Sequence, residues 1–510
     1  MNACAARAVE KSDEDRKKWY NGNNDSCFFG VILRDLLKNI FQVSTATSAE
    51  AYLVGGVVRD QLLGVAQSQD IDVVVIGSGL AFARAFDERV GHIGSLVEFP
   101  DFDTARYVFT EGEDVRKRVV LEVEFAGARH ESYVESSRKP LVAPTTLEQD
   151  LRRRDFTVNA MARKIQTRGL GRVIDLFDGE KDLREKILRT PLDPDQTFYD
   201  DPLRLLRAAR FASQLEFSIE RETLSAMARH AERLKIVSAE RIKEELFKLL
   251  GASQPSVGLW ILYGTKLLDE FLPEISALSG VEEVFGYTHK DNLSHTLAVV
   301  DNIASYSPSP LLRYAGLLHD VAKPATKKFI RSRGWTFDMH EHLGKKMARD
   351  ISHRLRFSVN ESRYVSKLIR WHLQPIALMD EGITDSAVRR LMVNVGDELS
   401  DLLILCRSDI TTGNQKKKER RLKNYDQLEQ RIAAVIEKDS LRAFQSPVRG
   451  EEIMLFCGLK PGPTVGKIKR AIEEAILNGQ IPNEYEAAKK YFENIKAEYL
   501  SRIESWEKAE

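Results

Sequence analysis

Two segments near the start of the chain decide the fold of its first domain: Gly55-Gly56-Val57-Val58-Arg59-Asp60 and, ten residues later, Asp70-Ile71-Asp72-Val73-Val74-Val75-Ile76. The first follows a short apolar run at residues 51–54 and precedes a helical pattern. The second is β-branched and ends in a Gly-Ser-Gly stretch, which predicts a buried strand. A helix at residues 80–90 and another strand at residues 119–125 follow. The sequence therefore predicts a mixed α/β domain.

A glycine pair at a strand-to-helix turn lets backbone N–H groups approach a phosphate closely, and the helix N-terminus favours negative charge. Gly55 and Gly56 are therefore candidate nucleotide-binding residues. Arg59 would add a cation for a triphosphate. A plain strand-to-helix turn explains the glycines equally well if they stand alone.

Asp70 and Asp72 lie at the start of the expected strand, and side chains at i and i+2 of a strand share one face. Two carboxylates held this close repel each other unless a cation lies between them. Mg²⁺ suits such a site because it prefers hard oxygen ligands. Solvation at a surface is the usual explanation for an isolated pair, but the glycine turn ten residues upstream favours a catalytic metal site.

A third carboxylate is expected from the strand at residues 119–125, where Glu122 and Glu124 point the same way. Glu124 is the better candidate because Arg129 lies five positions on. A basic cluster at residues 152–154 then leads into an apolar stretch at residues 156–162 that is expected to be buried.

Three residues of that region are further candidates for the nucleotide site. Arg154 could bind the triphosphate, and Asp155 and Asn159 could orient the ribose or the loop. A solvated charge run is the alternative explanation of the cluster.

The GGVVRD turn, the D-I-D strand and the RRDFTVNAMA segment together resemble, in order and spacing, the class II tRNA nucleotidyltransferases (CCA-adding enzymes) and bacterial poly(A) polymerases. The resemblance implies a polymerase-beta-like nucleotidyltransferase head that transfers CMP or AMP from CTP or ATP to an RNA 3′ end by two-metal phosphoryl transfer, releasing pyrophosphate. The expected acceptor is tRNA. It also implies that Asp70 and Asp72 hold Mg²⁺, and that Gly56, Arg59 and Arg154 contact the nucleotide.

The helix predicted after Asp201 and Pro202 spaces its arginines three apart, so Arg204, Arg207 and Arg210 form a slanted basic ridge. A solvent-exposed amphipathic helix is the alternative. The segment is similar to the family's E-D-x-x-R motif, which implies that Asp201 and Arg204 hydrogen-bond the incoming base and that the other two arginines are further nucleotide contacts. Asp201 also stands where a helix N-cap is expected, with proline at the first helical position.

Six of the ten histidines lie between residues 295 and 409, a region that also contains Asp320 and Asp409. Imidazole and carboxylate ligands suit transition metals. The ordered set resembles the H…HD…H…H…D signature of HD-domain phosphohydrolases. This resemblance implies a first divalent metal on His295, His319, Asp320 and Asp409, and a second metal on His342 and His372. Such a domain would hydrolyse phosphoesters, for instance 2′,3′-cyclic phosphates on RNA ends, or would serve only as a platform for tRNA.

From residue 201 onward the pattern is almost wholly helical, so we expect an α+β multidomain protein whose head is followed by all-α neck, HD and tail domains. The expected parts are an N-terminal extension and helix (1–45), the head (46–185), a neck for base recognition and RNA binding (186–275), the HD domain (276–435) and the tail (436–510). Residues 130–144 are expected to form a moving loop. The basic run at residues 416–423 either contacts RNA phosphates or is an exposed helix face.

The bulk composition is consistent with this organisation. Lys plus Arg and Asp plus Glu both number 76 in 510 residues, so RNA binding must come from local basic patches. Four separated cysteines without a C-x-x-C pair indicate neither a disulfide framework nor a zinc knuckle. With no long apolar run, we expect a cytoplasmic protein without a membrane partner.

The sequence leaves several functions open. The physiological reaction could be phosphoester hydrolysis at the HD site, with the head as an RNA-binding module. The head could also be a poly(A) polymerase, or the chain a pure binding protein. Nor does the sequence decide whether a transferase adds CCA, CC, a single A or a poly(A) tail.

Overall fold

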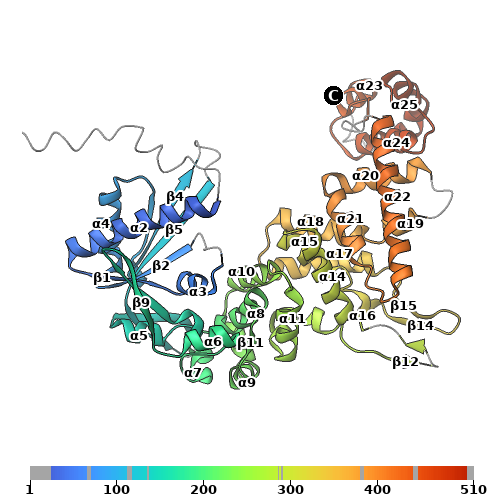
Figure 1. Ribbon diagram of the computed structural model, residues 1–510. Coiled ribbons are helices and arrows are strands. Elements are labelled where there is room, and N and C mark those ends of the chain that lie inside the picture. The colour runs from blue at the N-terminus through green and yellow to red at the C-terminus, as the bar shows by residue number, and fades with distance from the viewer. Residues whose placement is uncertain are drawn as a thin grey trace, which may run out of the picture. The chain divides into compact units, whose positions relative to one another are not determined.

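The computed structural model (Figure 1) describes residues 25–65, 70–111, 118–134, 137–284, 287–288, 291–379, 384–439 and 446–501. The chain divides into two compact units. The first contains residues 1–245 and 257–271, and the second contains residues 246–256 and 272–510. Most of the expected N-terminal extension lies outside the described residues.

A seven-stranded mixed sheet forms the centre of the first unit, in the order β3-β4-β5-β2-β1-β8-β9. Its strands are β1 (Glu50–Val54), β2 (Asp70–Ile76), β3 (Ser95–Phe99), β4 (Thr104–Glu111), β5 (Arg118–Gly127), β8 (Met161–Gln166) and β9 (Gly169–Asp175). Strands β2 and β5 are parallel, and the other neighbours are antiparallel. The strands expected at residues 51–54, 71–76 and 119–125 are confirmed as β1, β2 and β5. A separate hairpin, β6 (Arg129–Val134) and β7 (Ser137–Pro144), spans the expected moving loop, whose motion stays a prediction.

Two helices cover one face of this sheet, α2 (Asp25–Thr47) and α4 (Gly79–Val90) (Figure 1). Phe82 and Phe86 of α4 pack against Phe125 of β5, with ring centroids 5.5 and 5.0 Å apart. Because strand side chains alternate, Asp72 and Glu124 point to the opposite face. The sheet thus buries its aromatic core on the α4 side and presents its acidic residues on the other.

Short helices surround the sheet and continue into the region expected to be the neck. They are α3 (Gly56–Leu63), α5 (Leu147–Arg152), α6 (Gly179–Glu185), α7 (Pro194–Asp200), α8 (Leu203–Leu215), α9 (Arg221–Arg229), α10 (Ala239–Leu250), α11 (Pro255–Gly264) and α12 (Leu267–Phe271). The start of α8 corrects the prediction by one residue: Pro202 is the N-cap and Leu203 the first helical residue. The carboxylate of Asp201 nevertheless accepts a hydrogen bond from the Leu203 N–H at 3.1 Å.

The second unit is helical except for short hairpins. Its helices are α13 (Pro273–Ser276), α14 (Asn292–Tyr306), α15 (Pro310–Leu318), α16 (Lys323–Thr326), α17 (His340–Arg354), α18 (Val359–Trp371), α19 (Gln374–Ala377), α20 (Asp385–Val395), α21 (Leu399–Ser408), α22 (Gln415–Asp439), α23 (Gly450–Cys457), α24 (Pro463–Leu477) and α25 (Tyr485–Leu500). None of the described helices has the length and apolar character that crossing a membrane requires.

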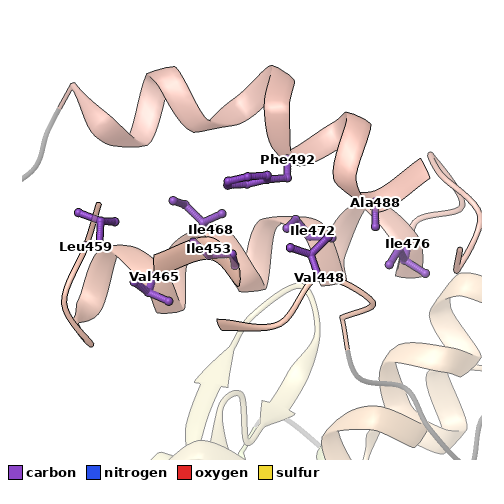
Figure 2. Close-up of a cluster of buried hydrophobic side chains, with 9 residues drawn as sticks. All are labelled: Val448, Ile453, Leu459, Val465, Ile468, Ile472, Ile476, Ala488 and Phe492. Carbon is purple, nitrogen blue, oxygen red and sulfur yellow. The ribbon is translucent and has the colours of Figure 1, made fainter. Parts of the chain in front are cut away.

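The last three helices have a hydrophobic core of their own, shown in Figure 2. It consists of nine buried side chains: Val448, Ile453, Leu459, Val465, Ile468, Ile472, Ile476, Ala488 and Phe492. Phe492 of α25 lies over the isoleucines of α24 in this view. A core that begins at residue 448 supports a separate tail domain, although the exact boundaries expected for all five domains stay predictions.

Candidate functional site

Two predicted metal ligands lie at the start of β2, on the face of the sheet away from α4. The register places Asp70 beside Glu122 and Asp72 beside Glu124 across the parallel β2–β5 pair. Water reaches Asp72, but the surrounding protein removes part of its hydration, and Glu124 repels its charge. These effects raise the pKa of Asp72 to about 6. A cation beside Asp72 would relieve this repulsion, so the carboxylates fit a divalent metal.

Gly55 connects the glycine turn to this carboxylate. It has φ +72°, and a Cβ built on it would lie 3.2 Å from both a carboxylate oxygen of Asp72 and a guanidinium nitrogen of Arg154. Only glycine fits this narrow, left-handed position without strain. Helix α3 begins at Gly56, and no side chain caps its N-terminus. The fold therefore brings together an acid, a cation and a free helix N-terminus from three separate segments.

Arg154 owes its position to Asp150, a residue that the sequence analysis did not single out. Asp150 is fully buried and accepts hydrogen bonds from Arg154 at 3.1 Å and from Arg153 at 2.5 Å. Burial alone would raise the pKa of Asp150, but the two guanidinium groups outweigh it and lower the pKa. Its position four residues before Arg154 was the only signal in the sequence.

Arg59 was predicted to contact the triphosphate, but its guanidinium already has protein partners. It donates to Asn159 at 2.7 Å and to Asp60 at 2.8 Å, and it lies 5.3 Å from the ring centroid of Phe211. The side chain is buried. In this structure Arg59 therefore links α3 to α8, and a direct role for it in binding nucleotide stays a prediction.

Asp155 and Asn159, expected to orient the ribose or the loop, belong to the same network. Asp155 accepts two hydrogen bonds from Arg207, at 2.8 and 2.5 Å, and one from Asn159 at 3.1 Å. Burial would raise the pKa of Asp155, but the charges of Arg207 and Arg204 and the hydrogen bonds from Arg207 and Asn159 together outweigh burial and lower the pKa to about 2. The expected burial of residues 156–162 is confirmed for Phe156 through Ala162. Asp155 and Asn159 thus connect the segment before β8 to Arg207 of α8.

We expect Asp155→Asn to lower the melting temperature of the head by roughly 4–8 °C at pH 7, since the shift corresponds to about 2 kcal/mol. The carboxyl pKa is lower in the folded state, so its stabilisation is complete well above pH 4 and is lost as the pH falls through 2. The difference between the variant and the wild type should therefore shrink below pH 4 in calorimetry. Asp195→Asn is the control, because its pair with Arg229 is half-exposed and should matter little. A deficit that does not change with pH would contradict this assignment.

The basic ridge of α8 is largely engaged within the protein. Arg204 is buried and donates to the carbonyl oxygens of Arg153 at 2.6 Å and Thr197 at 3.4 Å. Arg210 pairs with buried Glu245 at 2.7 Å. Burial outweighs this pairing and lowers the pKa of Arg210 to about 10. Neither arginine is free in this structure, so their contacts with a nucleotide, like that of Asp201, stay predictions.

Glu124 was predicted as the third catalytic carboxylate, and the structure supplies a competing partner. Arg106 of β4 lies 3.5 Å from both Glu124 and Glu122. The carboxylate oxygens of Asp70, Asp72 and Glu124 do not all lie within 4.8 Å of one another. Among the described residues, two other groups of possible metal ligands do lie within that distance. The catalytic role of Glu124 stays a prediction.

Those two groups lie together in the second unit and form what we call the HD cluster. Its members come from five segments: His295 of α14, His319 and Asp320 after α15, His340 of α17, His372 after α18, and Asp409 after α21. His295 lies 2.9 Å from Asp409, and His319 lies 3.1 Å from Asp320. His340 lies 3.4 Å from Asp320 and 3.3 Å from His372. Asp320 is shared by both groups.

The four imidazoles are oriented in the same way. Each Nδ1 atom lies 2.7 Å from an oxygen: Thr411 Oγ1 for His295, and the backbone carbonyls of Gly316, Phe337 and Ile369 for His319, His340 and His372. Such outer contacts orient imidazoles that bind a metal. Each Nε2 is then directed into the cluster. The buried Nε2 of His319 and Oδ2 of Asp320 lie 3.1 Å from each other, and the Lys323 ammonium lies 2.5 Å from the same oxygen.

The electrostatics of the HD cluster favour a bound cation. Burial would lower the pKa of His319, but Asp320 and Asp409 outweigh it and raise the pKa to about 10. Burial and the neighbouring charge of His319 lower the pKa of His372 to about 4. A neutral imidazole and two carboxylates that attract positive charge are suitable ligands for a divalent transition metal.

The prediction that His342 is a metal ligand is wrong in this structure. Its imidazole is about half-exposed, and its nearest acid is Glu341 at 3.6 Å. His340 takes its place in the HD cluster. Helix α17 begins at His340, and two positions along a helix turn the side chain by about 200°, so His342 points away. The remaining five predicted ligands all lie in the HD cluster.

We expect His340→Ala to remove about one of two bound metal ions per chain, because His340 and His372 with Asp320 form one of the two groups. His342→Ala is the matched control and should leave the metal content unchanged. The number of metal ions per chain is measured by inductively coupled plasma mass spectrometry after metal loading and dialysis. Loss of metal from the His342 variant alone would reverse the assignment.

Family models match most of the chain. The poly(A) polymerase head domain matches residues 51–189, the probable RNA and SrmB-binding site of polymerase A matches residues 216–278, and the HD domain matches residues 292–430.

Two curated relatives are similar along nearly their whole length. The CC-adding tRNA nucleotidyltransferase of Thermus thermophilus is 33% identical over 453 residues, covering 86% of this chain and 93% of the relative. The A-adding tRNA nucleotidyltransferase of Deinococcus radiodurans is 32% identical over 448 residues, covering 86% and 94%. In fold, the chain resembles the crystal structure of the Bacillus stearothermophilus CCA-adding enzyme in complex with CTP, with TM-score 0.64 and 20% identity over 92% of this chain and 99% of that one.

Proposed function

This chain belongs to the family of tRNA nucleotidyltransferases with a poly(A) polymerase head and an HD domain, and from this premise we propose that its head adds CMP, AMP or both to the 3′ end of tRNA. One observation carries the assignment of the site. Gly55 lies between Asp72 and Arg154 at the N-terminus of α3, so that a metal-binding acid, a phosphate-binding cation and free backbone amides meet. This is the set that a nucleoside triphosphate requires.

The acids and the arginine of this site have different proposed roles. Asp70 and Asp72 would hold Mg²⁺, which neutralises phosphate charge and makes the attacking 3′-hydroxyl more acidic. Arg154, fixed by Asp150, would bind the triphosphate from the other side of Gly55. The 3′-oxygen forms a bond to the α-phosphorus, and the bond to pyrophosphate breaks. The catalytic contribution of the chain is mostly positioning and charge stabilisation.

The product cannot be assigned by similarity, since a CC-adding and an A-adding relative are almost equally close. The test uses three tRNA transcripts that end before CCA, after one C and after CC, each incubated with Mg²⁺ and with CTP, ATP or both. Ordered addition of C, C and A that then stops would establish a CCA-adding enzyme. Addition of A only to the CC-ending transcript would make it an A-adding enzyme, and addition of C alone a CC-adding one. A failure to extend any transcript would contradict the proposal. Because the acceptor is tRNA, we place the reaction in the cytoplasm.

A second activity is supported by one specific observation in the HD domain. His319 and Asp320 are buried, and Asp320 belongs to both groups of imidazole and carboxylate ligands whose atoms lie close enough together to hold a metal ion. Imidazoles whose orientation is fixed by their Nδ1 contacts, together with carboxylates, suit a divalent transition metal. We propose that the HD cluster holds a divalent transition metal and hydrolyses phosphoesters, with 2′,3′-cyclic phosphates as the first substrates to test.

A further inference from the structure

The first turns of α22 concentrate positive charge on an exposed surface. Six residues form what we call the basic segment: Lys416, Lys417, Lys418, Arg420, Arg421 and Lys423. All are exposed except the half-buried Lys418. Across the described part of the chain, none of these six side chains makes an ion pair. In a chain whose charges cancel overall, this cluster is a local excess.

The three acids of α22 nearest to the basic segment do not neutralise it, since one acid cannot balance six cations and the other two pair with α21. Glu419, the acid inside the segment, accepts a hydrogen bond from Gln415 at 2.8 Å. Asp426 and Glu429 pair with Arg407 of α21, at 2.7 and 2.9 Å. Neutralisation by neighbouring side chains therefore does not explain the six cations.

The position of the cations also opposes helix stability. The N-terminus of a helix carries partial positive charge and favours acids, yet the first turn of α22 contains none. Lys416 and Arg420, like Lys417 and Arg421, are four residues apart, a spacing at which like charges repel. An anionic ligand would remove both unfavourable effects. The segment is therefore better suited to binding a polyanion than to forming a stable isolated helix.

The chain connects the basic segment closely to the HD cluster. Asp409 is the C-cap of α21, and Thr411 holds the Nδ1 atom of His295. Helix α22 begins only six residues after Asp409. Arg407 lies 5.6 Å from the ring of Tyr425, so the ten residues of α22 before Tyr425 extend about 15 Å past that contact. The basic segment thus projects from the end of α21 that carries the metal ligands.

We propose that the basic segment binds the sugar-phosphate backbone of an RNA strand whose terminal phosphoester enters the HD cluster. The inference rests on the hydrolytic function proposed for that cluster and names its substrate class. A free nucleotide has too few charges to use six cations. Lys416, Arg420 and Lys423 share one helix face at the i, i+4, i+7 spacing, which suits several phosphates along one strand.

The test compares the full-length wild type with a quadruple variant, Lys416→Gln, Lys417→Gln, Arg420→Gln and Arg421→Gln, both loaded with Mn²⁺ and, in parallel, Ni²⁺. One substrate is an RNA hairpin that ends in a 2′,3′-cyclic phosphate, and the other is 2′,3′-cyclic AMP. We expect the variant to raise KM for the RNA by about tenfold or more at moderate salt, with a weaker dependence of KM on salt, because phosphate contacts are lost. Hydrolysis of cyclic AMP should not change.

The matched control exchanges the same residues but keeps their charge: Lys416→Arg, Lys417→Arg, Arg420→Lys and Arg421→Lys. It should behave as the wild type on both substrates. The inference would be overturned if the glutamine variant hydrolysed the RNA with the wild-type KM, or if it lost activity equally on both substrates. Neither outcome would contradict the hydrolytic function proposed for the HD cluster. The inference would also be overturned if the variant raised the KM for tRNA in nucleotide addition as much as the KM for RNA hydrolysis. That result would assign the basic segment to the head reaction. A wild type that hydrolyses neither substrate would mean that the proposed HD function itself has failed.

Discussion

Asp70→Asn and Asp72→Asn are each expected to reduce the rate of nucleotide addition by on the order of 10³-fold or more, as losses of charge stabilisation at phosphoryl-transfer centres do. Both carboxylates share the face of the sheet away from α4, and Asp72 lies beside the glycine turn. Asparagine keeps the shape of the side chain but removes the charge that would hold Mg²⁺. The measurement is the single-turnover rate of nucleotide addition to tRNA with saturating Mg²⁺.

The controls for this prediction come from the neighbouring strand. Glu122→Gln removes a carboxylate from the same face and should change the rate by no more than about twofold to threefold, since Arg106 already pairs with it. Glu124→Gln tests whether that residue is a third catalytic acid. Substantial activity in either aspartate variant would refute the assignment of the site.

Stability should not account for the loss. The ionised form of Asp72 is unfavourable in the folded protein, because its pKa there is about 6 instead of the ordinary value of 3.8. This cost is absent below about pH 4 and is complete above about pH 6. In EDTA at pH 7.5, Asp72→Asn should therefore melt at the wild-type temperature or above it. A lower melting temperature would point to a structural role.

Asp320→Asn and His319→Ala are expected to abolish phosphoester hydrolysis while leaving nucleotide addition within about threefold of the wild type. Asp320 belongs to both groups of the HD cluster, so its loss should release both metal ions. The readouts are metal content, hydrolysis of 2′,3′-cyclic AMP, and nucleotide addition measured on the same preparations. Circular dichroism and melting temperature check that each variant folds, since both residues are buried.

The outcome separates the functions that the sequence left open. Loss of hydrolysis alone would establish two independent active sites in one chain. Loss of both reactions in a folded variant would contradict that independence. If the variants keep their metal and their hydrolysis, the HD cluster is not the hydrolytic centre, and a platform for tRNA becomes the better description of this domain.

Local patterns in the sequence predicted the elements that position the site. The β-branched run at residues 71–76 and the glycine turn before it identified β1, β2 and the start of α3, because strand and turn preferences act over a few neighbouring residues. Strands β3, β4, β8 and β9 were not predicted, since their sequences are less apolar and their pairing partners lie far along the chain.

The sequence by itself therefore determined which groups are present: two acids on one strand face, a glycine turn before a helix, and an ordered set of histidines and aspartates. Only the tertiary structure decided which of these side chains are free to bind a substrate or a metal and which are paired inside the protein. Asp155 and Arg207 are 52 residues apart, so their pairing, like that of Arg210 with Glu245, depends on packing. The choice of His340 over His342 depends on where α17 begins and which face it buries. Sequence spacing determines how two side chains of the same helix or strand are oriented. Which side chains of different helices and strands meet depends on the tertiary packing of the whole domain.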